Sequence, residues 1–168
     1  MKWQMAMLLM AALLLGLAVP AAAKRAPADL LGLTPGMSDA DAQHRLEKIG
    51  EVVRGEGKPK QTWKLNDPRY EYLVLRYDED WRVHWVTVFA REGGRRVRYR
   101  DIGDLKLATH LGQHFYDWSV PAHPGVGTWN VVARGSDPRY LESISISTSM
   151  RQALIVPAHV EGDDKDDD

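Results

Sequence analysis

Two β-rich runs separated by a short acidic link constrain the fold of this chain more than any other feature. Residues 70–77 read YEYLVLRY and residues 81–89 read WRVHWVTVF, with DED between them. Aromatic and β-branched residues favour strands, and a short polar link between two such runs favours an antiparallel hairpin. Period-two spacing in the second run predicts one face made of Trp81, Val83, Trp85 and Phe89 and an opposite face that begins with Arg82 and His84.

The clearest helix signal lies upstream, in the stretch SDADAQHRLEKIG. Ser38 is a favourable N-cap residue, and Ala42, Leu46 and Ile49 are spaced to form one apolar stripe. A glycine follows directly, and glycine commonly ends helices. The pattern predicts a helix over residues 38–49.

The second half of the chain repeats these signals less clearly. Residues 101–113 can form a second helix, and the runs HFYDWSV, TWNVVARG and YLESISIST are typical of strands. The predicted fold class is α+β, with one or two helices packed on a mainly antiparallel sheet; a division into two related helix-plus-sheet units stays open. The expected core includes Leu46, Ile49, Trp63, Leu73, Leu75, Val83, Trp85, Val97, Trp129, Ile144 and Ile146.

A four-residue motif, DPRY, occurs twice, at residues 67–70 and 137–140. In each copy the aspartate can accept hydrogen bonds from the backbone that follows, and the proline fixes φ for a turn. Both copies lie between a Trp-bearing run and a β-rich run. We interpret them as turns between strands rather than as a duplicated active site.

The N-terminus has the pattern of a secretory signal peptide. Lys2 precedes the apolar run from Met5 to Val19, and a proline and three alanines follow. We expect cleavage after Ala23, a single domain over residues 24–160, and a protein that is periplasmic or secreted, with no transmembrane segment after cleavage. The chain has no cysteine, so the core must form without disulfides.

The charge is uneven along the chain. Residues 161–168 contain six acidic residues and one lysine, whereas residues 24–160 contain 20 basic and 17 acidic residues. A terminal run of like charges is typical of a disordered, solvated tail, which is the prediction for residues 161–168. We expect no nucleic acid among the partners, because the protein is expected to leave the cytoplasm.

Arginines are concentrated in the stretch REGGRRVRYR, residues 91–100. If residues 81–100 form a hairpin, its outward face carries arginines and a histidine that can contact an acidic partner. This hypothesis names five binding residues: Arg82, His84, Arg96, Arg98 and Arg100. A solvated edge strand protected by charge explains the same pattern.

A second hypothesis places a metal site in the next segment. His110 and His114 are four residues apart, which on a helix would put both imidazoles on one face, and Asp117 and His123 follow. Such a cluster could hold Zn²⁺. The glutamate that follows the first histidine in zinc proteases is absent, and ordinary polar histidines are the favoured explanation of the pattern.

Two functional classes follow from these patterns. The favoured one is a non-enzymatic exported protein that binds a protein partner in the cell envelope and needs no cofactor. The alternative is a metal-dependent or hydrolytic enzyme built on the histidine cluster. The chain contains no G-x-S-x-G motif and no glycine-rich phosphate loop, which favours the first class.

Several short motifs resemble the SmpA/OmlA group, the small lipoproteins of the outer-membrane β-barrel assembly machine. Gly36-Met37-Ser38 resembles the helix start of that family, Ile49-Gly50 its helix stop, and Trp63 its first strand. Leu73, Leu75, Tyr77 and Val83 resemble its hairpin. The resemblance covers roughly residues 32–90 and implies the fold shared with β-lactamase-inhibitor protein, which contains two such units.

The signal-peptide pattern generates a first prediction. Mass spectrometry of the exported protein should find Lys24 as its first residue, because signal peptidase requires small residues at the positions that Ala21 and Ala23 occupy. Recovery of a membrane-bound product that still begins at Met1 would contradict it.

Overall fold

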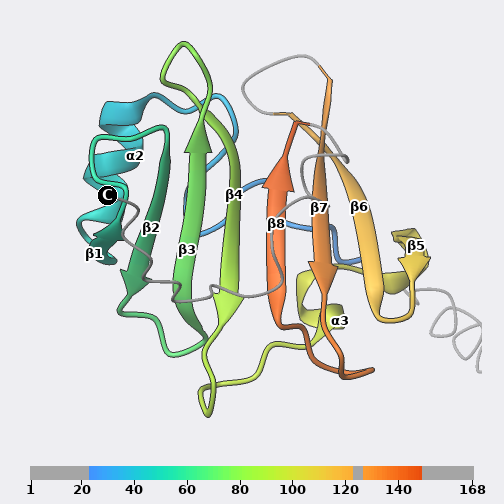
Figure 1. Cartoon of the computed structure of the whole chain (residues 1–168). Helices are drawn as coiled ribbons and strands as arrows, with labels where there is room; N and C mark the ends of the chain where they lie inside the picture. Colours follow the sequence, from blue (N-terminus) through green and yellow to red (C-terminus); the bar gives the residue numbers. More distant parts are fainter. Residues whose placement is uncertain (1–22, 123–126, 149–168) are drawn as a thin grey trace, which may run out of the picture.

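A computed structural model describes residues 23–122 and 127–148, in which eight strands form one sheet (Figure 1). Its strands are β1 (Gly50–Arg54), β2 (Lys60–Leu65), β3 (Tyr70–Tyr77), β4 (Val83–Ala90), β5 (Thr109–Gly112), β6 (Phe115–Pro121), β7 (Thr128–Arg134) and β8 (Ser143–Ser147). The strand order is β1-β2-β3-β4-β8-β7-β6-β5, and every neighbouring pair is antiparallel. The predicted signal segment and acidic tail lie outside the described residues, apart from Ala23.

The sheet consists of two four-stranded meanders that meet at β4 and β8. Strands β1 to β4 follow one another in space, and so do β5 to β8, but the second set runs in reverse order across the sheet. The last strands of the two meanders pair through five register positions, with Val86 opposite Ile146 and Val88 opposite Ile144. All four side chains are fully buried, so the junction between the meanders lies in the middle of the core.

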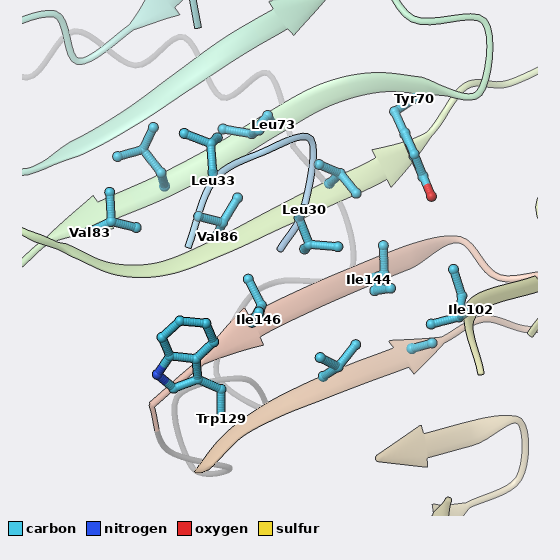
Figure 2. Packing of buried hydrophobic residues seen from close by; sticks show 14 of the residues in the cluster. Leu30, Leu33, Tyr70, Leu73, Val83, Val86, Ile102, Trp129, Ile144 and Ile146 are labelled. Carbon is cyan, nitrogen blue, oxygen red and sulfur yellow. The ribbon is translucent and has the colours of Figure 1, made fainter. Parts of the chain in front are cut away.

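One face of the sheet, which we call the core face, carries the main hydrophobic core. The helix α2 (Asp39–Leu46) covers it through Ala42 and Leu46. Toward the junction of the meanders, Leu30 and Leu33 from the N-terminal lead-in pack among β-strand residues such as Ile144 (Figure 2). Figure 1 shows this lead-in passing behind the sheet.

The α+β prediction is wrong, because the fold is predominantly β. Helix α2 has eight residues, and the only other α-helix among the described residues is α3 (Tyr99–Ile102), which has four. The helix expected over residues 101–113 does not form: after α3 there is a short 3-10 helix, Leu105–Leu107, and then β5. Pairing with β6 extends the sheet by one strand, and this tertiary contact outweighs the weak local helix preference of a segment with two glycines and a β-branched threonine.

The strongest helix prediction agrees with the structure at its start and fails at its end. The Ser38 hydroxyl accepts a hydrogen bond from the Asp41 backbone N–H at 3.2 Å, as expected of an N-cap. The helix ends at Leu46 rather than at Ile49. The helix ends early because β1 already starts at Gly50, where it pairs with Leu65 of β2. Glycine is required at this position, because a Cβ atom would lie 2.2 Å from the Lys64 carbonyl oxygen.

The face assignment within β4 is also wrong, and a β-bulge explains why. Tyr77 pairs with Val83 while Arg76 pairs with Trp85, so His84 is an extra residue that reverses the alternation. Val83 remains in the core, but Trp85 lies on the opposite face of the sheet. The expected core residues are otherwise buried on the core face, except that Ile49 is half-buried.

Both DPRY motifs form turns, as predicted. The two turns do not occupy equivalent places in the two meanders. The Asp67 carboxylate accepts from the backbone N–H of Arg69 at 2.7 Å and of Tyr70 at 3.2 Å. Asp137 accepts from the backbone N–H of Arg139 at 2.7 Å. The first turn joins the second and third strands of its meander, the second joins the third and fourth, so the motif reflects turn chemistry rather than repeat position.

Replacement of Asp67 by alanine should destabilise the fold. The substitution removes two backbone hydrogen bonds and the ion pair with Arg69 at 2.9 Å, and we expect a loss of about 1–2 kcal/mol of unfolding free energy at pH 7. Burial acts to raise the pKa of Asp67, but Arg69 and the backbone donors hold that pKa below its ordinary value of 3.8. A carboxyl group whose pKa is lowered by folding stabilises the fold at pH values above its ordinary pKa. This stabilisation is lost as the pH falls through the pKa of the folded state.

Urea denaturation at several pH values measures this effect. The difference between wild type and Asp67→Ala should shrink as the pH falls below 3.8. Asp137→Ala is the matched control, and its effect should be smaller because that carboxylate accepts one backbone hydrogen bond where Asp67 accepts two. Equal losses in the two variants would refute the account.

Candidate functional site

The loop that follows β4, residues 91–98, connects the two DPRY turns at one end of the sheet. The backbone N–H of Arg95 donates to the Pro68 carbonyl at 2.9 Å, which ties the loop to the first turn. The Leu141 N–H donates to the Val97 carbonyl at 3.0 Å, just after the second turn. Because β4 and β8 are neighbours, the two turns and the loop lie at the same end of the molecule (Figure 1).

Arg91 fastens this loop to the first turn. Its guanidinium donates to three backbone carbonyl oxygens: those of Leu65 at 2.8 Å, Asp67 at 3.0 Å and Tyr70 at 3.3 Å. Three donors directed at the backbone leave little of this guanidinium for a ligand. We therefore regard Arg91 as a structural residue.

Arg96 is held in place on the opposite side of the loop. Its guanidinium donates to the Asp137 carboxylate at 2.9 Å and lies 3.8 Å from the centroid of the Tyr140 ring. The backbone N–H of Arg139 and then the Arg96 guanidinium hold the pKa of Asp137 below its ordinary value, so this carboxylate is ionised at neutral pH. The Arg96 side chain is still 56% exposed, which leaves part of it free to contact a ligand.

Four arginines surround a shallow depression of about 490 Å³ beside this loop, and we call them the arginine cluster: Arg69, Arg95, Arg96 and Arg98. Asp67 and Asp101 also line the depression, so its side chains carry a net charge of +2, from four cations and two anions. Asp67 pairs with Arg69, and Asp101 lies 3.6 Å from Arg98. Among the described residues, the Arg95 guanidinium makes no hydrogen bond or ion pair, so it remains available to an anion.

A larger groove of about 860 Å³ lies on the other side of Arg96, and we call it the aromatic groove. Tyr72 from β3 and Phe89 from β4 supply its aromatic wall. Glu71, Glu92 and Glu142 are also among its lining residues. Arg96 lines both the groove and the depression, so it stands where the two concave surfaces meet.

The structure divides the five predicted binding residues between the two ends of β4. Residues 91–98 form a loop rather than the second strand of a hairpin, so the expected common face does not exist. Arg82 and His84 lie at the start of β4, where the Arg82 guanidinium donates to the Gly36 carbonyl at 3.1 Å. Eight residues of β4 at about 3.3 Å each place roughly 26 Å between them and the loop. Of the five, Arg96 and Arg98 belong to the arginine cluster, and Arg100 lies next to it in α3.

The proposed metal ligands are not brought together. His110 is in β5 with its ring against Tyr116, whereas His114 is in the β5–β6 turn with a positive φ of 58°. Asp117 points to the opposite face of β6 from Tyr116, and its buried carboxylate accepts from the Asn130 amide at 3.0 and 3.1 Å. Burial raises the pKa of Asp117. His123 lies outside the described residues.

The helical spacing on which the metal hypothesis depended is therefore absent. Within residues 23–122 and 127–148, no three His, Cys, Asp or Glu side chains are grouped closely enough to hold a metal ion. The strand alternation in β5 and β6 explains this outcome, because neighbouring residues of a strand face opposite sides.

Several residues of the site were not predicted from the sequence. Arg95 belongs to the same arginine-rich run, so composition alone could have included it. Tyr140 is the last residue of the second DPRY motif. An aromatic residue next to an arginine is a signal for cation–π contact, so the motif itself could have indicated it. Tyr72 and Phe89 had no usable signal, because their pairing across β3 and β4 depends on the bulge at His84.

Comparison with known proteins identifies no relative: no protein-family model, curated protein or solved structure matches the chain. The resemblance to the SmpA/OmlA lipoproteins therefore stays a prediction. None of the helices in the described part has the length and hydrophobicity of a membrane-spanning helix.

The two arginines of the loop should respond differently to replacement by alanine. Arg91→Ala removes three hydrogen bonds from a charged donor and should cost about 2 kcal/mol of unfolding free energy. Arg96→Ala removes an exposed ion pair, which solvent screens, and a cation–π contact, so its loss of unfolding free energy should be smaller. Urea denaturation of both variants tests the assignment, and a larger loss for Arg96→Ala would reverse it.

Proposed function

We propose that this protein is a non-enzymatic module of the cell envelope, exported to the periplasm or the exterior, that binds a protein partner through the arginine cluster and the aromatic groove. The observation that carries the proposal is the position of Arg96. This residue is fixed by Asp137 and Tyr140 and lies where the two concave surfaces meet. An arginine that is already ordered loses less side-chain entropy on binding than a mobile one.

The two surfaces favour a partner segment of mixed character. A carboxylate of the partner fits the depression, whose net charge is +2 and where Arg95 has unused donors. An apolar or aromatic side chain fits the groove beside Tyr72 and Phe89. The three glutamates that line the groove repel a uniformly acidic segment, which gives selectivity for acidic residues next to apolar ones.

A capture experiment with matched variants tests this function. The full chain, immobilised, is exposed to an envelope extract, and the retained proteins are identified by mass spectrometry. The double variant Arg95→Gln and Arg96→Gln should lose the partner that the wild type retains, and added salt should weaken capture by the wild type, since the contact is partly exposed and charged. Both substitutions are on the surface, so the variant should keep its fold.

The control is a second double variant, Arg54→Gln and Lys58→Gln, which removes two positive charges at the β1 end of the sheet. The proposal requires that this control retain the partner as well as the wild type does. If both variants lose the partner equally, net charge rather than the arginine cluster determines capture. If neither loses it, the binding surface lies elsewhere.

A further inference from the structure

The face of the sheet opposite α2, which we call the outer face, carries a row of six side chains that crosses six strands in one line. Register pairs connect them in this order from β2 to β6: Thr62, Val74, Thr87, Ser145, Val132 and Asp117. All six residues are at most 7% exposed. Above and below the row, Trp85 and Phe89 are 8% and 7% exposed.

This burial is unexpected for an outer face. A sheet with one covered face normally solvates the side chains of the other. The described segments outside the strands, namely the lead-in, α2, α3 and the 3-10 helix, contribute to the cluster on the core face. The second cluster, Val74, Trp85 and Phe89 with Tyr72, contains strand residues only. The loop after β4 reaches the Phe89 end of this face, where it lines the aromatic groove, but no described segment outside the strands belongs to the second cluster.

We propose that the outer face is the docking surface for this chain's own residues 149–160, which follow β8. Their sequence is SMRQALIVPAHV, with four consecutive apolar residues at 153–156. Apolar side chains there match the rings and methyl groups that Val74, Trp85 and Phe89 would present to water if the face had no cover. This inference does not rest on the arginine cluster. It shares Phe89 with the aromatic groove, so residues 149–160 and a partner segment would meet at that ring.

The place where the described chain ends supports this occupant. Strand β8 lies in the middle of the sheet, and its last residue, Ser147, pairs with Trp85. Residues 149–160 therefore start next to the patch that needs a cover. Twelve extended residues span up to about 40 Å, whereas six strands at about 4.8 Å spacing are only about 24 Å across.

The other parts of the chain outside the described residues fit less well. Residues 1–22 join the described chain on the core face, where the Lys24 carbonyl accepts from the Asp104 N–H at 2.8 Å. Residues 123–126 connect β6 and β7, and four residues cannot reach β4, which is two strands beyond β7. A second copy of the chain is the remaining alternative, and the experiment below separates it from residues 149–160.

Methyl NMR with a soluble paramagnetic chelate tests the proposal. The chelate broadens methyl signals that solvent can reach. In the full chain the signals of Val74 and Val132 should be protected. In a chain that ends at Thr148 they should broaden as strongly as those of Val53, which is 50% exposed. Val86 and Val131, on the core face, should stay protected in both and report that the fold is intact.

A chain that lacks only residues 161–168 is the matched control and should protect Val74 and Val132 as the full chain does. A synthetic peptide of residues 149–160 should restore protection to the chain that ends at Thr148. If that chain does not fold, the full-length double variant Leu154→Asp and Ile155→Asp replaces it, with the same expected exposure of both valines.

Four results would overturn the proposal. The first is exposure of Val74 and Val132 in the full chain. The second is protection that persists in the chain ending at Thr148, or in the aspartate variant if it replaces that chain. The third is protection that disappears on dilution together with a halving of the mass in light scattering, which would assign the outer face to a second copy. A parallel measurement on a chain that begins at Lys24 should show full protection, and exposure there would assign the face to residues 1–22.

Discussion

The pairing of β4 with β8 is the interaction on which the rest of this structure depends. Two meanders that each end on a hydrophobic strand would leave that strand as an exposed edge, and such edges invite aggregation. Here the two last strands pair with each other, so the backbone groups along each edge are hydrogen-bonded to the other strand. This contact also places four buried side chains at the centre of one core: Val86, Val88, Ile144 and Ile146. The same pairing places the second DPRY turn beside the loop that leaves β4.

The candidate site is a consequence of that pairing. Arg91 attaches the loop to the first turn, and Arg96 contacts the second through Asp137 and Tyr140. A single loop thus uses both turns as supports, and the aromatic wall of the groove comes from the neighbouring strands. The proposed binding function needs no flexible element, because the sheet that forms the core also positions the cations.

Local signals in the sequence predicted local features well. Ser38 caps α2, both DPRY aspartates accept from the turn backbone, and the apolar residues of β3 and β8 are buried. These features depend on neighbours in sequence, so their residue types are sufficient. They do not depend on how distant strands pair.

Features that depend on distant pairing were not predictable in this way. One extra residue, His84, reverses the face of Trp85, and pairing with β6 converts residues 109–112 from an expected helix into a strand. The common arginine face failed for the same reason, because residues 91–98 follow the turns instead of continuing the sheet. Arg96 and Arg98 were named as candidate binding residues from composition and both line the depression, but the partners that hold Arg96 could be identified only in three dimensions.

The proposed binding mode requires that Arg96 is ordered before any partner binds. Nitrogen-15 relaxation of the arginine side chains in the free protein measures this directly. We expect a rigid Nε–H group for Arg96, because Asp137 and Tyr140 hold its guanidinium, and a mobile one for Arg95, which has no such partners among the described residues. Equal mobility of the two side chains would contradict the account.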